Sequence, residues 1–98
     1  SLQQTFISDP HFEKVRDTVM GRCAMCHAPE PGWEGIVAPP KGVTLDTDRN
    51  IAAHAREIYL QAGRSHAMPP ANVTGVTDQE RQLLASWYES AVSGGQKQ

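Results

Sequence analysis

Apolar residues recur at helical spacing in three segments of this 98-residue chain. In the first segment, Asp9 and Pro10 are residue types favoured at an N-cap and at the first helical position. The apolar face of this segment consists of Phe12, Val15 and Val19. The spacing predicts a first helix that begins here and leads directly to Cys23.

Two more helices are expected later in the chain. One runs from about residue 50 to residue 62 and stops at Gly63, a residue type common just after a helix end. The other opens with a capping box over residues 77–80 and ends before Gly94 and Gly95. Their apolar faces consist of Ile51, Ala55, Ile58, Tyr59 and Ala62 in the former, and Leu84, Trp87, Tyr88 and Ala91 in the latter. We expect the last helix to pack across the first.

Residues 28–48 are rich in proline and glycine, which break regular elements, and predict an extended loop. The three helices and this loop indicate an all-α fold with one domain over residues 9–93. Residues 1–8 are then expected to form a flexible N-terminal linker, and residues 94–98 a polar C-terminal tail. The chain has no signal peptide and no apolar run near eighteen residues, which is consistent with a domain excised from a longer protein.

Composition adds two constraints. With 39% hydrophobic residues and only two each of Phe, Trp and Tyr, the chain has modest means to build a core, so a bound cofactor would contribute packing surface. We expect a largely unfolded chain without it. The net charge of −2, with nine basic and eleven acidic side chains and no long charge run, argues against nucleic acid as a partner.

Both cysteines fall in the segment Cys23-Ala24-Met25-Cys26-His27, and C-x-x-C-H is the attachment sequence of a c-type haem. Two thiols about one helical turn apart suit thioether bonds to one porphyrin, with His27 as an axial ligand of the iron. A zinc site fits less well, because His54 and His66 are twelve positions apart. A thioredoxin-like dithiol also fits less well, because it occurs among βαβ units and the pattern around this motif is helical. A structural disulfide between residues three positions apart would constrain the chain little.

A second axial ligand must come from elsewhere, and Met68 is the main candidate. The prolines that follow it restrict its backbone and place it on a stiff, non-helical loop. His66 competes for the same role because imidazole also binds haem iron, and His54 is a weaker competitor. Met20 and Met25 are expected to fill gaps in the core, and His11 to be a solvated surface residue.

Other contacts to the cofactor are predicted from the loops and basic residues. A carbonyl at Pro39 or Pro40 is the expected acceptor for the Nδ1 hydrogen bond of the axial histidine. Trp33, Arg49 and Arg64 are candidate donors to haem propionates. Each of these residues is equally well an ordinary surface or packing residue.

Together these features resemble class I cytochromes c, which share a helix into C-x-x-C-H, a distal Met before Pro, and a C-terminal helix with aromatic residues. Here these are Cys23 to His27, Met68-Pro69-Pro70 and Trp87-Tyr88. More narrowly, residues 11–36 and 54–88 are similar to the cytochrome c domain at the C-terminus of bacterial membrane-bound urate oxidases. The resemblance implies a small class I cytochrome c fold, with three main helices and long loops around one covalent haem c.

The narrower resemblance also implies a function and a location. An upstream membrane-embedded domain would oxidise urate, and this domain would relay the electrons to a soluble cytochrome c or a terminal oxidase on the periplasmic side of the bacterial inner membrane. The isolated domain would be an electron carrier and not an enzyme. A haem enzyme or gas sensor with an open, peroxidase-like distal site is the alternative, and a non-haem interaction module is a third class.

Overall fold

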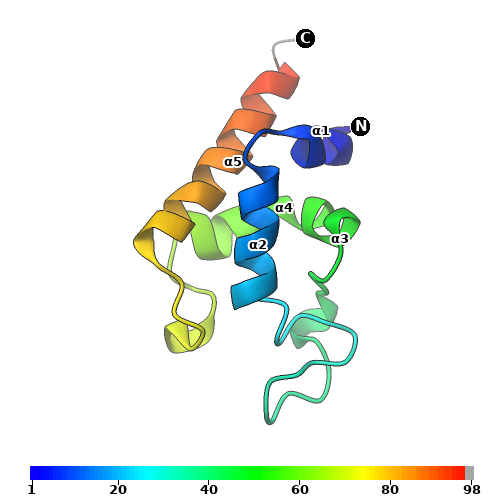
Figure 1. Ribbon diagram of the computed structural model, residues 1–98, viewed down its shortest axis with the longest axis vertical. Coiled ribbons are helices and arrows are strands. Elements are labelled where there is room, and N and C mark those ends of the chain that lie inside the picture. The colour runs from blue at the N-terminus through cyan, green and yellow to red at the C-terminus, as the bar shows by residue number, and fades with distance from the viewer. Residues whose placement is uncertain (97–98) are drawn as a thin grey trace.

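The computed structural model describes residues 1–96, and the part of the chain that it describes is helical, with no strand (Figure 1). This confirms the expected all-α class. The elements in chain order are α1 (Leu2–Ser8), α2 (Phe12–Arg22), the 3₁₀ turn η1 (Pro40–Gly42), α3 (Asp48–Ala53), α4 (Ala55–Ile58), the π-helical turn η2 (Tyr59–Gly63), the 3₁₀ turn η3 (Pro70–Asn72) and α5 (Asp78–Gln96). None of the helices within residues 1–96 is long and apolar enough to cross a membrane.

Residues 1–8, expected as a flexible linker, instead contain α1. The side chain of Ser1 caps this helix by accepting a hydrogen bond from the Gln4 N–H at 3.2 Å. Phe6 is buried, with its ring centroid 5.2 Å from that of Trp87, and its carbonyl accepts a hydrogen bond from the Trp87 indole at 3.0 Å. One buried aromatic side chain therefore docks a helix too short to show an apolar period.

The second helix starts two residues later than the sequence suggested. Because α1 ends at Ser8, Asp9 is extended, and the α2 N-cap position falls to His11. Asp9 still contributes, since its carboxylate accepts a hydrogen bond from the His11 N–H at 2.9 Å. The expected apolar face is confirmed, because Phe12, Val15 and Val19 are all buried in the core.

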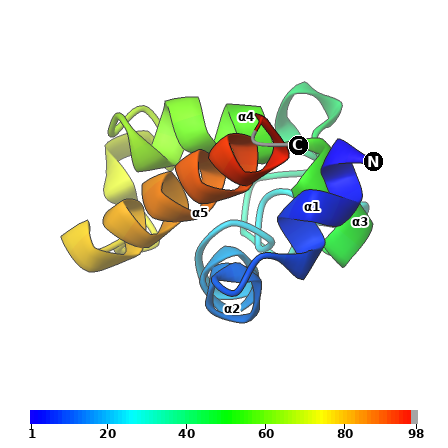
Figure 2. The same cartoon turned by 90° about the horizontal axis from the view of Figure 1, so that it is seen from above.

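The last helix packs across α2, as predicted. Seen from above, α5 lies between α4 on one side and α1 and α2 on the other (Figure 2). The capping box is also confirmed: the Thr77 N–H donates to Glu80 Oε1 at 2.8 Å, and the Glu80 N–H donates to Thr77 Oγ1 at 3.1 Å. The helix does not end before Gly94 but continues to Gln96, because glycine weakens a helix without blocking its hydrogen bonds. Residues 97–98 of the expected tail lie outside the described residues.

The predicted middle helix is divided into α3, α4 and η2. The division falls at His54, whose backbone leaves the helical region (φ −106°, ψ 21°). The wider turn of η2 closes with a hydrogen bond of 2.7 Å from the Arg64 N–H to the Tyr59 carbonyl. Gly63 lies against α5, where a Cβ atom would be only 3.1 Å from the Ala85 nitrogen. Its lack of a side chain therefore permits a close approach of two backbones.

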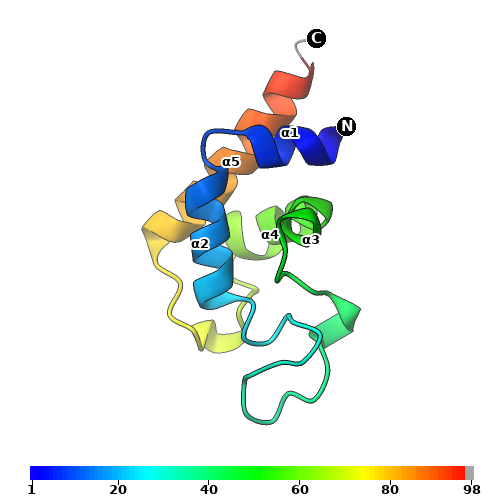
Figure 3. The same ribbon diagram turned by 45° about the vertical axis from the view of Figure 1, so that its right-hand side comes forward.

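The long loop after α2 was also predicted, and it contains only η1 as a regular element. In both Figure 1 and Figure 3, this loop and the segment around η3 extend from the lower end of the molecule on two sides of the C-terminal end of α2. The helices thus pack together in one part of the molecule, and these two irregular segments lie on either side of its other end.

Candidate cofactor site

A cavity of about 610 Å³ lies between the C-terminal end of α2, the loop that follows it, the α4–η2 segment and residues 68–74. Its size is typical of small-molecule and cofactor pockets. Seven of the candidate site residues singled out from the sequence line it: Cys23, Cys26, His27, Trp33, Pro40, His54 and Met68. Segments far apart in the chain therefore bring two thiols, an imidazole and a thioether to one cavity.

The C-x-x-C-H segment forms a compact turn directly after α2. The Cys23 N–H continues the helical pattern by donating to the Val19 carbonyl at 2.8 Å. The Cys23 carbonyl then accepts hydrogen bonds from the N–H groups of Cys26 at 3.2 Å and His27 at 3.0 Å. Both cysteines are free thiols and half-buried. These backbone hydrogen bonds fix the backbone positions of Cys23, Cys26 and His27 relative to α2.

The imidazole of His27 is oriented by the loop. Its Nδ1 lies 2.9 Å from the carbonyl oxygen of Val43, and because a carbonyl only accepts, Nδ1 carries the proton. This leaves Nε2 as the nitrogen with a lone pair for a metal ion. The acceptor was expected at Pro39 or Pro40, which is wrong. The Leu45 N–H bonds the His27 carbonyl, and this contact brings residue 43 to the ring.

Met68 lies on a non-helical segment, as predicted, and its backbone is held from both directions. Its N–H donates to the Gln61 carbonyl at 2.8 Å, and its carbonyl accepts from Nη1 of Arg81 at 3.0 Å. The residue is half-buried at the cavity wall. These two hydrogen bonds to other elements therefore add to the backbone restriction that the prolines after Met68 impose.

The histidines that compete with Met68 as second axial ligand differ in whether they line the cavity. His66 is exposed and is not among the residues that line the cavity. His54 does line it, beside Glu57, with 3.2 Å between its Nδ1 and the Glu57 carboxylate. His11 is half-buried rather than fully solvated, and its Nδ1 lies 2.6 Å from Asp9. Of the alternatives to Met68, the structure places only His54 at the cavity.

Some predicted contacts do not reach the cavity. Neither Arg49 nor Arg64 lines the cavity. Arg49 is exposed, and the guanidinium of Arg64 lies 6.0 Å from the ring centroid of Tyr59. Pro40 lines the cavity, but Pro39 does not. Met20 and Met25, expected to fill gaps in the core, are instead 44% and 37% exposed. Met20 follows the buried Val19 and so is turned out of the α2–α5 interface.

The electrostatics of Cys23 bear on which thiol chemistry is available. Burial raises its pKa to about 11, the Cys26 thiol and the Glu80 carboxylate add to this effect, and Arg81 opposes it. Cysteines of thiol–disulfide exchange motifs have a lowered pKa, which supplies the reactive thiolate. Cys23 is protonated at neutral pH, and the described residues contain no strand. Both observations disfavour the thioredoxin-like dithiol.

Within residues 1–96, no three side chains of His, Cys, Asp and Glu come together as a group that could hold a metal ion. Comparisons with protein-family models, with curated proteins and with solved structures gave no match to this chain. The resemblance to class I cytochromes c therefore depends on the residues quoted above.

Sequence reasoning missed the residues that hold His27 and Met68 in place. Val43 acts through its backbone carbonyl, for which a sequence contains no signal. Arg81 does leave a signal, because it lies three residues before Leu84 and thus on the apolar face of α5. It is only 4% exposed. A charged residue at a core position of an amphipathic helix indicates a buried polar network.

Proposed function

We propose that this chain is an electron-transfer domain that holds one covalent haem c in the cavity. Cys23 and Cys26 are the thioether anchors, and His27 and Met68 are the two axial ligands. The observation that carries the proposal is the orientation of His27 at the cavity it shares with two free thiols and a thioether. With Nδ1 engaged by Val43, the imidazole has the tautomer that a metal-bound histidine requires.

The cavity suits a large, flat, mostly apolar group. Its walls include Ile36, Leu45 and Ile58 together with the indole of Trp33, and the thiols stand at the end of α2. A haem bound by a histidine and a methionine supplies a one-electron couple without an open coordination position. The chain's own contribution is to orient His27, hold Met68 and exclude water with the apolar walls.

A narrower proposal follows from the resemblance alone. In it, the domain belongs to a longer membrane-anchored protein, accepts electrons from an upstream urate-oxidising domain, and passes them to a soluble cytochrome c or a terminal oxidase on the periplasmic side. The likeness of residues 11–36 and 54–88 to such domains supports it. Deleting the domain from the intact protein should abolish respiratory urate oxidation, and undiminished oxidation would contradict the relay.

A haem enzyme or gas sensor is the second candidate. The observation in its favour is the pair of His54 and Glu57 at the cavity wall, since an imidazole beside a carboxylate is a common general acid or base. His66, which the sequence offered as a competing axial ligand, is exposed and does not line the cavity. This candidate requires that the iron have no sixth protein ligand.

The deciding experiment is the optical spectrum of the chain in both oxidation states, after maturation in a host that attaches haem c. Met68→Ala is compared with Met20→Ala, which removes an exposed methionine outside the cavity. We expect a low-spin spectrum with the weak red sulfur-to-iron band, lost only in Met68→Ala. A bis-histidine spectrum indifferent to that change would transfer the ligand role to His54 or His66. A high-spin spectrum would favour the enzyme or sensor.

A further inference from the structure

Arg81 is a charged side chain buried in the core, and the described residues show no acidic partner within ion-pair distance of it. Its guanidinium instead donates to oxygen atoms of residues 62–74, the segment that contains Met68 and is called the ligand segment below. Nη1 lies 2.9 Å from the Ala62 carbonyl, 3.2 Å from the Ser65 carbonyl and 3.0 Å from the Met68 carbonyl. A buried charge is costly unless it is hydrogen-bonded, and here the ligand segment supplies those bonds.

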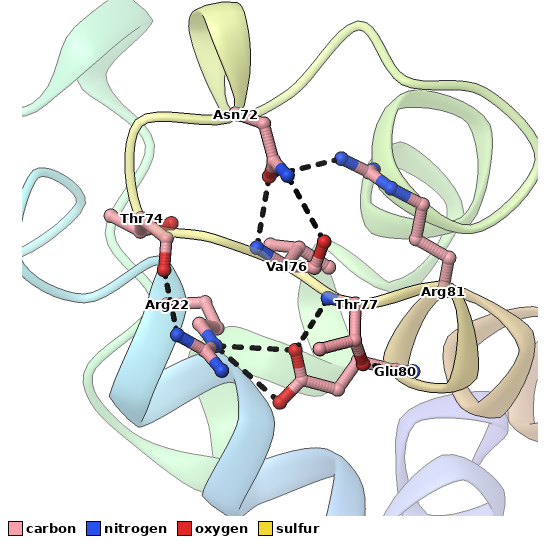
Figure 4. Close-up of polar contacts among 7 residues, drawn as sticks. All are labelled: Arg22, Asn72, Thr74, Val76, Thr77, Glu80 and Arg81. Atoms are coloured by element: carbon pink, nitrogen blue, oxygen red, sulfur yellow. Dashed lines mark hydrogen bonds and ion pairs between the residues drawn. The ribbon is translucent and has the colours of Figure 1, made fainter.

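The second nitrogen of the same guanidinium extends the network to η3. Nη2 of Arg81 lies 3.3 Å from Oδ1 of Asn72 (Figure 4). The Asn72 amide in turn bonds both backbone groups of Val76, accepting from its N–H at 2.9 Å and donating to its carbonyl at 3.1 Å. Asn72 has a φ of 51°, a left-handed conformation that asparagine tolerates well. The side chain of Arg81 therefore forms hydrogen bonds with the chain both before and after Met68.

A separate contact holds the far end of this segment. Arg22 of α2 donates to the Thr74 carbonyl at 2.7 Å and to the Glu80 carboxylate at 3.2 Å (Figure 4). Arg22 does not touch Met68 or its immediate neighbours in any hydrogen bond found within residues 1–96. Among the hydrogen bonds of residues 1–96, the one from Arg81 connects α5 to the carbonyl of the proposed axial ligand.

We propose that Arg81 is a positioning residue for Met68: by holding the Met68 carbonyl, it determines how firmly the thioether stays on the iron. This inference rests on the proposed function. A neutral thioether is a weak ligand, so its retention depends on how few alternatives its backbone has. The planar fork of arginine reaches several carbonyls and Asn72 at once, whereas the single ammonium group of lysine cannot reproduce that geometry.

The test is the affinity of the oxidised, haem-loaded chain for imidazole, which must displace Met68 to bind. We expect Arg81→Lys and Arg81→Gln to bind imidazole at least about tenfold more tightly than the wild type, equivalent to about 1.4 kcal/mol, and to weaken the red band. Phe6→Ala is the control, because it destabilises the core without touching this network. Its imidazole affinity should stay within about twofold of the wild type while its unfolding free energy falls.

The outcomes separate the two proposals. If the wild type shows the red band and both Arg81 variants bind imidazole like the wild type, the role of Arg81 is wrong and the ligand assignment stands. If the wild type lacks the band, the ligand assignment fails and this inference fails with it. If neither Arg81 variant folds, Asn72→Gly decides, because it keeps the left-handed backbone and removes the Nη2 partner of Arg81 together with the two hydrogen bonds to Val76, while the three carbonyl partners of Nη1 remain. An affinity gain of about threefold supports the role, and an unchanged affinity overturns it.

Discussion

Replacing Phe6 with alanine tests whether α1 is an integral part of the domain. Phe6 is 3% exposed and contacts both Trp87 and Tyr88, with ring centroids 5.2 and 5.5 Å away. Truncating a buried phenylalanine costs about 3–5 kcal/mol. Because α1 can undock instead of leaving a closed cavity, we expect the lower value, about 3 kcal/mol. That loss is a large part of the 5–15 kcal/mol that stabilises a typical domain.

The measurement is urea unfolding of the haem-loaded chain followed by far-ultraviolet circular dichroism. With a denaturant slope of about 1.5 kcal/mol per molar, the midpoint of Phe6→Ala should fall by about 2 M. Leu2→Ala is the matched control, since Leu2 lies on the same helix but is 57% exposed, and its effect should stay within about 0.5 kcal/mol. A loss below about 1 kcal/mol in Phe6→Ala would mean that α1 is the linker that the sequence suggested.

Two further predictions concern the ends of α5 and η2. Burial opposes ionisation of Glu80, but the Thr77 N–H and Arg22 together hold its pKa below the ordinary value of 4.5. Its charge therefore stabilises the fold above pH 4.5, and this contribution disappears as the pH falls through the lower folded pKa. Glu80→Gln, which keeps the cap hydrogen bond, should cost about 0.5–1 kcal/mol at pH 7 in urea unfolding and less at pH 3; a loss of the same size at both pH values would contradict the charge argument. Gly63→Ala should destabilise the chain by about 1 kcal/mol in the same assay, because overpacking against the α5 backbone exceeds the entropic gain of about 0.4–1 kcal/mol; an increase in stability would show that η2 can move away from α5.

The helices that the sequence predicted best are those with a strong apolar period. The apolar faces of α2 and α5 and the capping box of α5 follow from residue spacing, because each involves side chains within a few positions of one another. The linker assignment for residues 1–8 failed because α1 is held by Phe6 against Trp87, 81 positions away. The close fit of Gly63 on α5 is likewise a tertiary contact with no local sequence pattern.

The residues of the candidate site also fall into those predicted from the sequence and those missed. Cys23, Cys26, His27 and Met68 were found because their side-chain chemistry and spacing are distinctive. Val43 was missed, because a backbone carbonyl is present at every residue. Candidate ligands can thus be predicted from the sequence by their side chains, whereas a residue that orients them through its backbone becomes visible only when the loop is folded.

Helix α5 links the core to the ligand segment. Its middle residues Leu84 and Trp87 are buried against the core, and Arg81 lies one turn earlier on the same face. A sliding movement of α5 would therefore carry Arg81 with it and shift the Met68 carbonyl that Arg81 holds. Phe6 contacts Trp87 and Tyr88, about two turns along α5 from Arg81, so we expect removal of this contact to leave the hydrogen bonds of Arg81 in place. The packing of α5 then has two separable consequences: total stability depends on its whole length, and retention of the proposed axial ligand depends on its first two turns.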